Sequence, residues 1–334
     1  MNELFIRADM NSSISMGHMM RCLSVADSAK ERGAGCTIIT ADEQPEGLIR
    51  ERGHECIVLG SSWDDMEGEL AELEKVIEKH GIKKLLIDSY QVSESYLRKV
   101  NSLTDVYYLD DLNSFLYPVH AVINYANYAT DSFYPVRFPG TLFYLGCGYA
   151  PLREAFKSPV PKKINFEVKN LLVMSGGSDP FGILGKILNV IPAGRYNDIN
   201  VICGNYNERE EELRAAYEND PSVHIYSHVQ KIWELYEQAD IAISAGGSTL
   251  YELSSMGVPT ITYSFVDNQI PNVRSFDTDE LMPCAGDVRG GNVPARIAEL
   301  LDRVESYEYR TAVSRRLQSV VDGKGADRLA ALLL

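Results

Sequence analysis

The sequence lacks any apolar run long enough to cross a bilayer, and its first residues lack the basic region and apolar stretch of a signal peptide. We therefore expect a cytoplasmic protein without membrane insertion. Its six cysteines form no C-x-x-C pair and lie far apart, mostly within apolar segments. This pattern favours reduced, buried thiols over a disulfide framework.

Clustered positive charge is absent as well. The chain has a formal net charge of -15, and its 32 lysines and arginines are dispersed. Such a chain repels nucleic acid and anionic membranes, so we expect neither as a partner. A small anionic substrate is still compatible with it, because backbone N–H groups and helix N-termini bind phosphate without a positive net charge.

A recognisable metal-ligand pattern is also missing. The five histidines other than His18 share no spacing, and none has a cysteine or carboxylate partner at metal-ligand spacing. We predict no metal site and no cofactor.

Short apolar runs alternate with helical patterns along the whole chain, as in parallel sheets wrapped by helices. The apolar runs lie at residues 4–6, 36–39, 84–87, 106–109, 171–174, 200–203 and 241–243. A chain of 334 residues exceeds one typical domain. The sequence therefore predicts an α/β protein of two Rossmann-like domains facing across a cleft.

The pattern breaks in a stretch that is rich in proline and lysine. We place an N-terminal domain at residues 1–153, a linker at residues 154–166 and a C-terminal domain at residues 167–334. The last stretch, residues 307–334, has a helical pattern with one interruption at residues 323–325. Its helices are candidates for crossing back to the first domain.

Three loops have the form of ligand-binding loops, since open α/β sheets bind ligands where strands end and helices begin. In the predicted second domain, one loop contains Ser175, Gly176 and Gly177, before a helix expected from Pro180 with Asp179 as its cap. Turn chemistry alone accounts for these glycines about as well as ligand binding does.

The other loop of the second domain combines glycines, hydroxyls and a helix start: Gly246, Gly247, Ser248 and Thr249, with Glu252 one turn further on. A diphosphate on the loop amides, with ribose hydroxyls on Glu252, fits this pattern.

The first domain offers Gly17 and His18 at a helix start, after Ser15 and Met16. A water nucleophile needs a base that is neutral at pH 7, and an imidazole meets this condition. The positive end of the helix dipole disfavours the imidazolium. The alternative is a histidine that merely caps or packs, and Arg21, one turn on, either balances leaving-group charge or is a solvated helix residue.

Carboxylates end two predicted strands of the first domain, at Asp88 and at Asp110 with Asp111. Catalytic carboxylates are common at such places, but capping of the next helix or loop is the safer interpretation.

The run ISAGGSTLYELSSMGVPTITY, followed by Asn268 and Gln269, resembles the nucleotide-binding signature of the MurG-like glycosyltransferase superfamily, which has the GT-B fold. Further motifs are similar, in order, to the UDP-2,4-diacetamido-2,4,6-trideoxy-β-L-altropyranose hydrolases of pseudaminic acid biosynthesis. These are FIRAD, GHMMRCLSVA, LLIDSY, YLDDL, YLGCGYAPLREAF, LLVMSGGSDPF and VVDGKGADR.

The resemblance implies metal-independent hydrolysis of a UDP-sugar, in which water attacks the anomeric carbon with inversion and UDP departs. It implies that His18 is the general base and that Tyr90 lies near the sugar. Asn268 and Gln269 would contact the nucleotide sugar, and Ser248, Thr249 and Glu252 would hold diphosphate and ribose. A glycosyltransferase, a hydrolysing epimerase and a non-catalytic nucleotide-sugar-binding protein are the alternatives on the same fold.

Overall fold

The computed structural model describes residues 3–11, 14, 16–157, 159–204 and 206–334, and it divides into two compact units. The first unit comprises Met1–Lys157 and Gly323–Leu334, and the second comprises Ser158–Asp322. The division between them falls inside the stretch expected as a linker. Each unit is a parallel sheet with helices on its faces, which confirms the predicted pair of Rossmann-like domains.

The sheet of the first unit has the strand order β3-β2-β1-β4-β5-β6-β7, and neighbouring strands pair in parallel. Its strands are β1 (Glu3–Ala8), β2 (Gly35–Thr40), β3 (Glu55–Val58), β4 (Lys84–Asp88), β5 (Asp105–Leu109), β6 (Ala121–Asn124) and β7 (Leu142–Leu145). Its helices are α1 (Gly17–Glu31), α2 (Glu46–Glu51), α3 (Met66–His80), α4 (Glu94–Asn101) and α12 (Gly325–Leu333), with the short 3-10 helices η1 (Cys147–Tyr149) and η2 (Glu154–Phe156).

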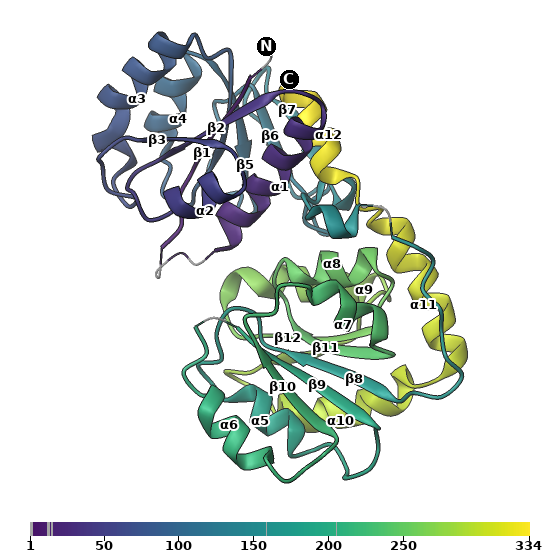
Figure 1. Ribbon diagram of the computed structural model, residues 1–334. Coiled ribbons are helices and arrows are strands. Elements are labelled where there is room, and N and C mark those ends of the chain that lie inside the picture. The colour runs from purple at the N-terminus through teal and green to yellow at the C-terminus, as the bar shows by residue number, and fades with distance from the viewer. Residues whose placement is uncertain (1–2, 12–13, 15, 158, 205) are drawn as a thin grey trace. The chain divides into compact units, whose positions relative to one another are not determined.

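Strand β1 buries apolar side chains on both sides because helices cover both faces of this sheet. Leu4 and Ile6 pack in a core with α1 and α12, whereas Phe5 packs with α3 and α4 on the other face. Figure 1 shows α1 beside the yellow helix α12, which brings the end of the chain back to the first unit. The Ser28 hydroxyl of α1 donates a 2.7 Å bond to Asp327 of α12.

The second unit repeats this architecture with the strand order β10-β9-β8-β11-β12-β13. Its strands are β8 (Asn170–Met174), β9 (Asp198–Cys203), β10 (Val223–Ser227), β11 (Ile241–Ala245), β12 (Thr260–Ser264) and β13 (Cys284–Asp287). Its helices are α5 (Ile183–Leu188), α6 (Glu210–Tyr217), α7 (Ile232–Gln238), α8 (Thr249–Ser255), α9 (Ile270–Thr278), α10 (Val293–Val304) and α11 (Tyr307–Val320), with η3 (Asp267–Gln269) as a 3-10 turn.

The helix expected from Pro180 begins three residues later, at Ile183. Gly182 has a left-handed backbone, with φ of 58°, and therefore separates the preceding turn from the helix. The Asp179 carboxylate does cap the helix, because it accepts bonds from the amides of Ile183 at 2.7 Å and Leu184 at 3.1 Å.

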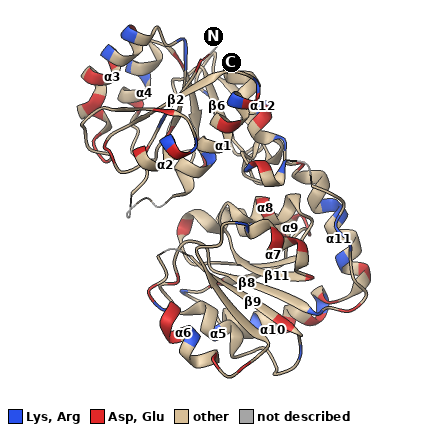
Figure 2. Cartoon of the chain, in the orientation of Figure 1, with Lys and Arg blue, Asp and Glu red and all other residues tan. Residues whose placement is uncertain are grey.

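Charged side chains of both signs are scattered over both units (Figure 2). Within the part of the chain that the structure describes, no helix is both long and apolar enough to cross a membrane.

The turn at Gly176 and Gly177 lies directly against Gly204, which follows β9. A Cβ atom on Gly204 would stand 2.1 Å from the Gly176 carbonyl oxygen, whereas a Cβ on Gly177 would meet nothing within 4 Å. We expect Gly204→Ala to lower the free energy of unfolding by about 1–3 kcal/mol through overpacking. Gly177→Ala is the matched control and should change it by about 0.5 kcal/mol or less. Urea unfolding measures both, and equal effects would contradict the contact.

Candidate active site

His18 and Asp88 meet at the point where the strand order of the first sheet reverses. Helix α1 follows β1, and β4 pairs with β1 in parallel. The start of α1, which carries His18, and the end of β4, which carries Asp88, therefore lie at one edge of the sheet. In open α/β sheets this topological switch point is the usual ligand site.

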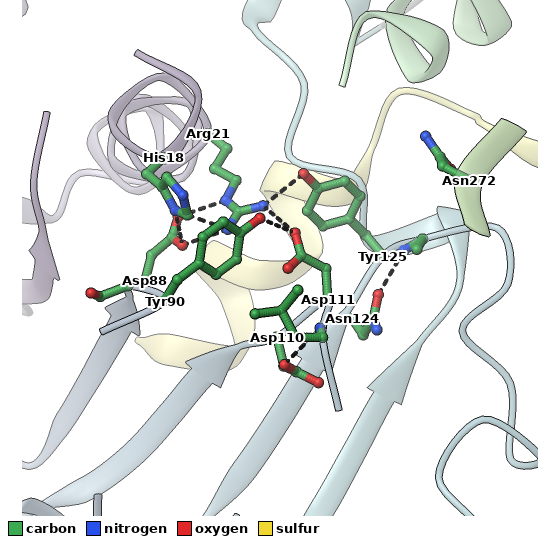
Figure 3. A network of polar contacts seen from close by, with 12 residues as sticks. His18, Arg21, Asp88, Tyr90, Asp110, Asp111, Asn124, Tyr125 and Asn272 are labelled. Atoms are coloured by element: carbon green, nitrogen blue, oxygen red, sulfur yellow. Dashed lines mark hydrogen bonds and ion pairs between the residues drawn. The ribbon is translucent and has the colours of Figure 1, made fainter. Parts of the chain in front are cut away.

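A buried carboxylate holds the two polar residues of the first turns of α1 (Figure 3). Asp88 Oδ1 lies 2.6 Å from His18 Nδ1. Arg21 donates to both oxygens of Asp88, from Nε at 2.6 Å and from Nη2 at 2.5 Å. The side chain of Asp88 is fully buried, and those of His18 and Arg21 are 10% and 11% exposed.

The Asp88 carboxyl is ionised in this environment. Burial by itself raises its pKa, but the charge of Arg21 and the hydrogen bonds from Arg21 and His18 outweigh burial and hold the pKa well below its usual range. A carboxylate can only accept, so His18 Nδ1 carries a proton and donates it to Asp88. The other ring nitrogen, Nε2, then has the free lone pair of the neutral imidazole.

Tyr90 packs edge-on against His18, with ring centroids 4.6 Å apart. Its hydroxyl donates to Asp111 Oδ2 at 2.7 Å, and Arg21 Nη1 donates to the Tyr125 hydroxyl at 2.9 Å. Burial raises the pKa of the Tyr90 phenol, and the Asp111 charge raises it further. Tyr90 is therefore a neutral donor and not a proton acceptor at pH 7.

His18 and Tyr90 border a small hollow, open to solvent, in the first unit. Its walls are Asp9, Ile14, His18, Trp63, Asp88, Ser89, Tyr90 and Gln91. Asp9, Trp63 and Gln91 were not among the residues predicted from the sequence. Asp9 stands at the carboxyl end of β1, which was the available signal.

The structure brings together Gly17, His18, Arg21 and Tyr90, as the sequence suggested, while Ser15 lies outside the described residues. Three interpretations of the neighbouring residues change. Asp88 binds His18 and Arg21 instead of capping a helix, and Arg21 is not a solvated helix residue. Asp110 does cap a turn, through the amides of Leu112 and Asn113, whereas Asp111 accepts from Tyr90.

The two glycine-containing loops of the second unit also meet at a topological switch point. Ser175 follows β8 and Gly246 follows β11, and these strands pair in parallel. Ser175 is fully buried, and its hydroxyl has no hydrogen-bond partner among the described residues. Gly176 and Gly177 are exposed beside it.

The loop from Gly246 to Thr249 differs from the predicted cradle in one respect. The Gly246 amide donates to Tyr263 O at 2.9 Å, and the Gly247 amide donates to Ala245 O at 2.9 Å. Both glycine amides are therefore used inside the protein. Gly246 is required for packing, since a Cβ there would lie 2.4 Å from Val273.

The remaining predicted residues of the second unit lie nearby on α8 and η3. Ser248 is exposed and Thr249 is half-buried at the start of α8. Glu252 accepts a bond from the Tyr236 hydroxyl at 3.2 Å. Asn268 is exposed, while Gln269 accepts from the Phe265 amide at 3.1 Å.

No metal centre is evident in the described ranges. Among those residues, no group of three or more His, Cys, Asp or Glu side chains is arranged to hold an ion.

Comparisons with known proteins agree with this architecture. Residues 171–285 match the family model for the glycosyltransferase family 28 C-terminal domain, and this span contains both loops of the second unit. MurG of Acinetobacter baumannii aligns with 100% of this chain and 99% of its own, with a TM-score of 0.73 at 12% identity. The chain thus has the fold of GT-B glycosyltransferases such as MurG.

Relatives by sequence include the spore coat polysaccharide biosynthesis protein SpsG of Bacillus subtilis (strain 168). It is 27% identical, over 98% of this chain and 96% of the relative. A Helicobacter pylori protein (strain ATCC 700392 / 26695) is 29% identical over 41% of this chain and 24% of its own length. That protein is described as pseudaminic acid cytidylyltransferase and UDP-2,4-diacetamido-2,4,6-trideoxy-beta-L-altropyranose hydrolase.

The buried charge of Asp88 should contribute to the free energy of unfolding. Asp88→Asn leaves Arg21 with only its longer ion pair to Asp111, at 3.5 Å, so we expect a loss of about 3–5 kcal/mol in the free energy of unfolding at pH 7. Because the folded pKa of Asp88 lies below the unfolded value of about 3.9, its contribution is full above about pH 4 and is lost as pH falls towards the folded pKa. The difference in the free energy of unfolding between wild type and Asp88→Asn should therefore become smaller below about pH 4.

Urea unfolding at pH 7 and pH 3 measures this difference. Asp131→Asn is the control, because its side chain is 90% exposed and its loss should cost about 0.5 kcal/mol or less. A difference between wild type and Asp88→Asn that is the same at both pH values would contradict the assignment.

Proposed function

We propose that this protein hydrolyses a UDP-linked 2,4-diacetamido-2,4,6-trideoxy hexose to UDP and the free sugar, as in nonulosonic (pseudaminic) acid biosynthesis. Water attacks the anomeric carbon while its proton passes to His18 Nε2. The bond from that carbon to the diphosphate oxygen breaks, and its electron pair leaves with UDP. The sugar is released with inverted configuration. The similarity to the Helicobacter pylori protein supports this choice of sugar.

The observation that carries the proposal is the His18–Asp88 pair beside the hollow. Asp88 fixes the imidazole with Nδ1 protonated, which leaves Nε2 as proton acceptor. It also stabilises the imidazolium that forms when His18 takes the proton. Arg21 keeps Asp88 ionised through two bonds, so the carboxylate that orients His18 is charged at neutral pH.

We place the nucleotide on the second unit, at the loops that the glycosyltransferase family 28 match contains. The two glycine amides are occupied, so diphosphate contacts fall to the hydroxyls and amides of Ser248 and Thr249. Glu252 then accepts from the ribose hydroxyls, and Asn268 and Gln269 contact the nucleotide sugar.

A second candidate is glycosyl transfer from the same nucleotide sugar to an acceptor hydroxyl. The match to a glycosyltransferase domain favours it. His18 would then deprotonate the acceptor instead of water, so the two reactions share a base and differ in nucleophile.

One assay separates them. The purified protein is incubated with UDP-2,4-diacetamido-2,4,6-trideoxy-β-L-altropyranose in the presence of EDTA and without acceptor, and UDP release is followed. UDP-N-acetylglucosamine is the comparison substrate. We expect UDP release from the trideoxy sugar and an inverted anomer by NMR. Absence of UDP release would refute the hydrolase proposal. UDP release only after an acceptor is added would favour glycosyl transfer.

His18→Ala should lower turnover by about two orders of magnitude or more while leaving UDP affinity nearly unchanged, because only the base is lost. His224→Ala is a matched control, since His224 also contacts an aspartate, Asp198 at 2.8 Å, but on the half-exposed surface of the second unit. Parallel loss of turnover in both variants would refute the role of His18.

Tyr90→Phe tests whether the phenol takes part in proton transfer. The hydroxyl only donates to Asp111, and the ring contact with His18 survives in phenylalanine. We expect turnover to fall by about tenfold or less, with a larger loss in Tyr90→Ala because the imidazole loses its packing. A drop in Tyr90→Phe as large as that in His18→Ala would show that the phenol handles the proton.

A further inference from the structure

Asp9 is a second, fixed carboxylate on the wall of the hollow that contains His18. It follows β1 and is 5% exposed. Its Oδ1 accepts from the Ala41 amide at 2.7 Å, and its Oδ2 accepts from Arg7 Nη1 at 2.6 Å. A carboxylate offers about four acceptor positions, so about two of them have no partner among the described residues.

The buried guanidinium of Arg7 has a second carboxylate partner, Glu69, besides Asp9. Arg7 is fully buried and donates to Glu69 from Nε at 2.8 Å and from Nη2 at 2.5 Å. Glu69 is also fully buried, accepts from the Tyr96 hydroxyl, and does not line the hollow. The charge of Arg7 is thus already matched by Glu69, and Asp9 is an additional negative charge.

Negative charge therefore exceeds positive charge around the hollow. The charged side chains joined in the two clusters are Asp9, Glu69, Asp88 and Asp111 against Arg7 and Arg21. Such a site repels a diphosphate but suits a neutral group that carries O–H and N–H donors. It also stabilises positive charge that develops at an anomeric carbon as the leaving group departs.

We infer that the hollow receives the glycosyl group and not the diphosphate, and that Asp9 contacts this group by accepting a hydrogen bond from a sugar hydroxyl or acetamido N–H. Trp63 and Tyr90 supply aromatic wall for the apolar side of the sugar. This inference rests on the proposed function, since it assigns a role within the same site.

The first experiment measures binding in the His18→Ala background, so that the ligand is not consumed. Calorimetry compares UDP with the UDP-linked di-N-acetylated trideoxy sugar. Adding Asp9→Asn should weaken the UDP-sugar by about tenfold or more, as for a lost bond to a charged group, and leave UDP within about twofold. Adding Glu69→Gln is the matched control, because Glu69 also pairs with Arg7. This substitution should not weaken binding of the UDP-sugar relative to binding of UDP.

The second experiment locates the sugar. The chain has two tryptophans, so in a Trp233→Phe variant the emission of Trp63 reports on the hollow. The UDP-sugar should change this emission, and UDP alone should not. In the active enzyme, Asp9→Asn should also reduce kcat by about a hundredfold.

Equal effects of Asp9→Asn and Glu69→Gln on both ligands would overturn the inference, because a merely structural carboxylate predicts them. An equal response of Trp63 to UDP alone would overturn it as well. Absence of UDP release by the wild-type protein is a separate result: it refutes the hydrolase, while a selective loss of UDP-sugar binding in Asp9→Asn would still establish the glycosyl site.

Discussion

The site of the first unit depends on the buried carboxylate of Asp88. A charge at that depth is costly unless it is paired and hydrogen-bonded, and Arg21 and His18 supply this compensation. The two residues lie three positions apart on α1, so they project from the same face of the helix towards β4. The imidazole orientation and its edge-on contact with Tyr90 depend on this one anchoring point.

Much of the fold could be predicted from the sequence, because parallel strands buried on both faces appear as apolar runs. All seven apolar runs that we selected lie within strands. The strands β3, β6, β7, β10, β12 and β13 were not selected. Segments such as β3, whose residues are exposed or half-buried, and β13, which contains Gly286, carry a weaker apolar signal.

The positions of the candidate site were harder to predict. His18, Arg21 and Tyr90 were found through their motifs, but the partnership of His18 with Asp88 depends on β4 lying beside β1, and strand order is not visible in local periodicity. For the glycines of the second unit, the sequence pattern was visible but its cause was ambiguous. Gly246 is constrained by Val273, so a glycine pattern that suggests phosphate binding is also dictated by packing. Which of these residues contact a ligand stays a prediction.

The return of α12 to the first unit makes that unit discontinuous along the chain. Leu329 and Leu333 complete the core that α1 begins, yet they are synthesised after the whole of the second unit. At ~5–20 residues per second, roughly 10–35 s separate the emergence of residue 157 from that of residue 334. During this interval the apolar face of α1 has no covering helix, so the second unit can complete its core on the ribosome before the first.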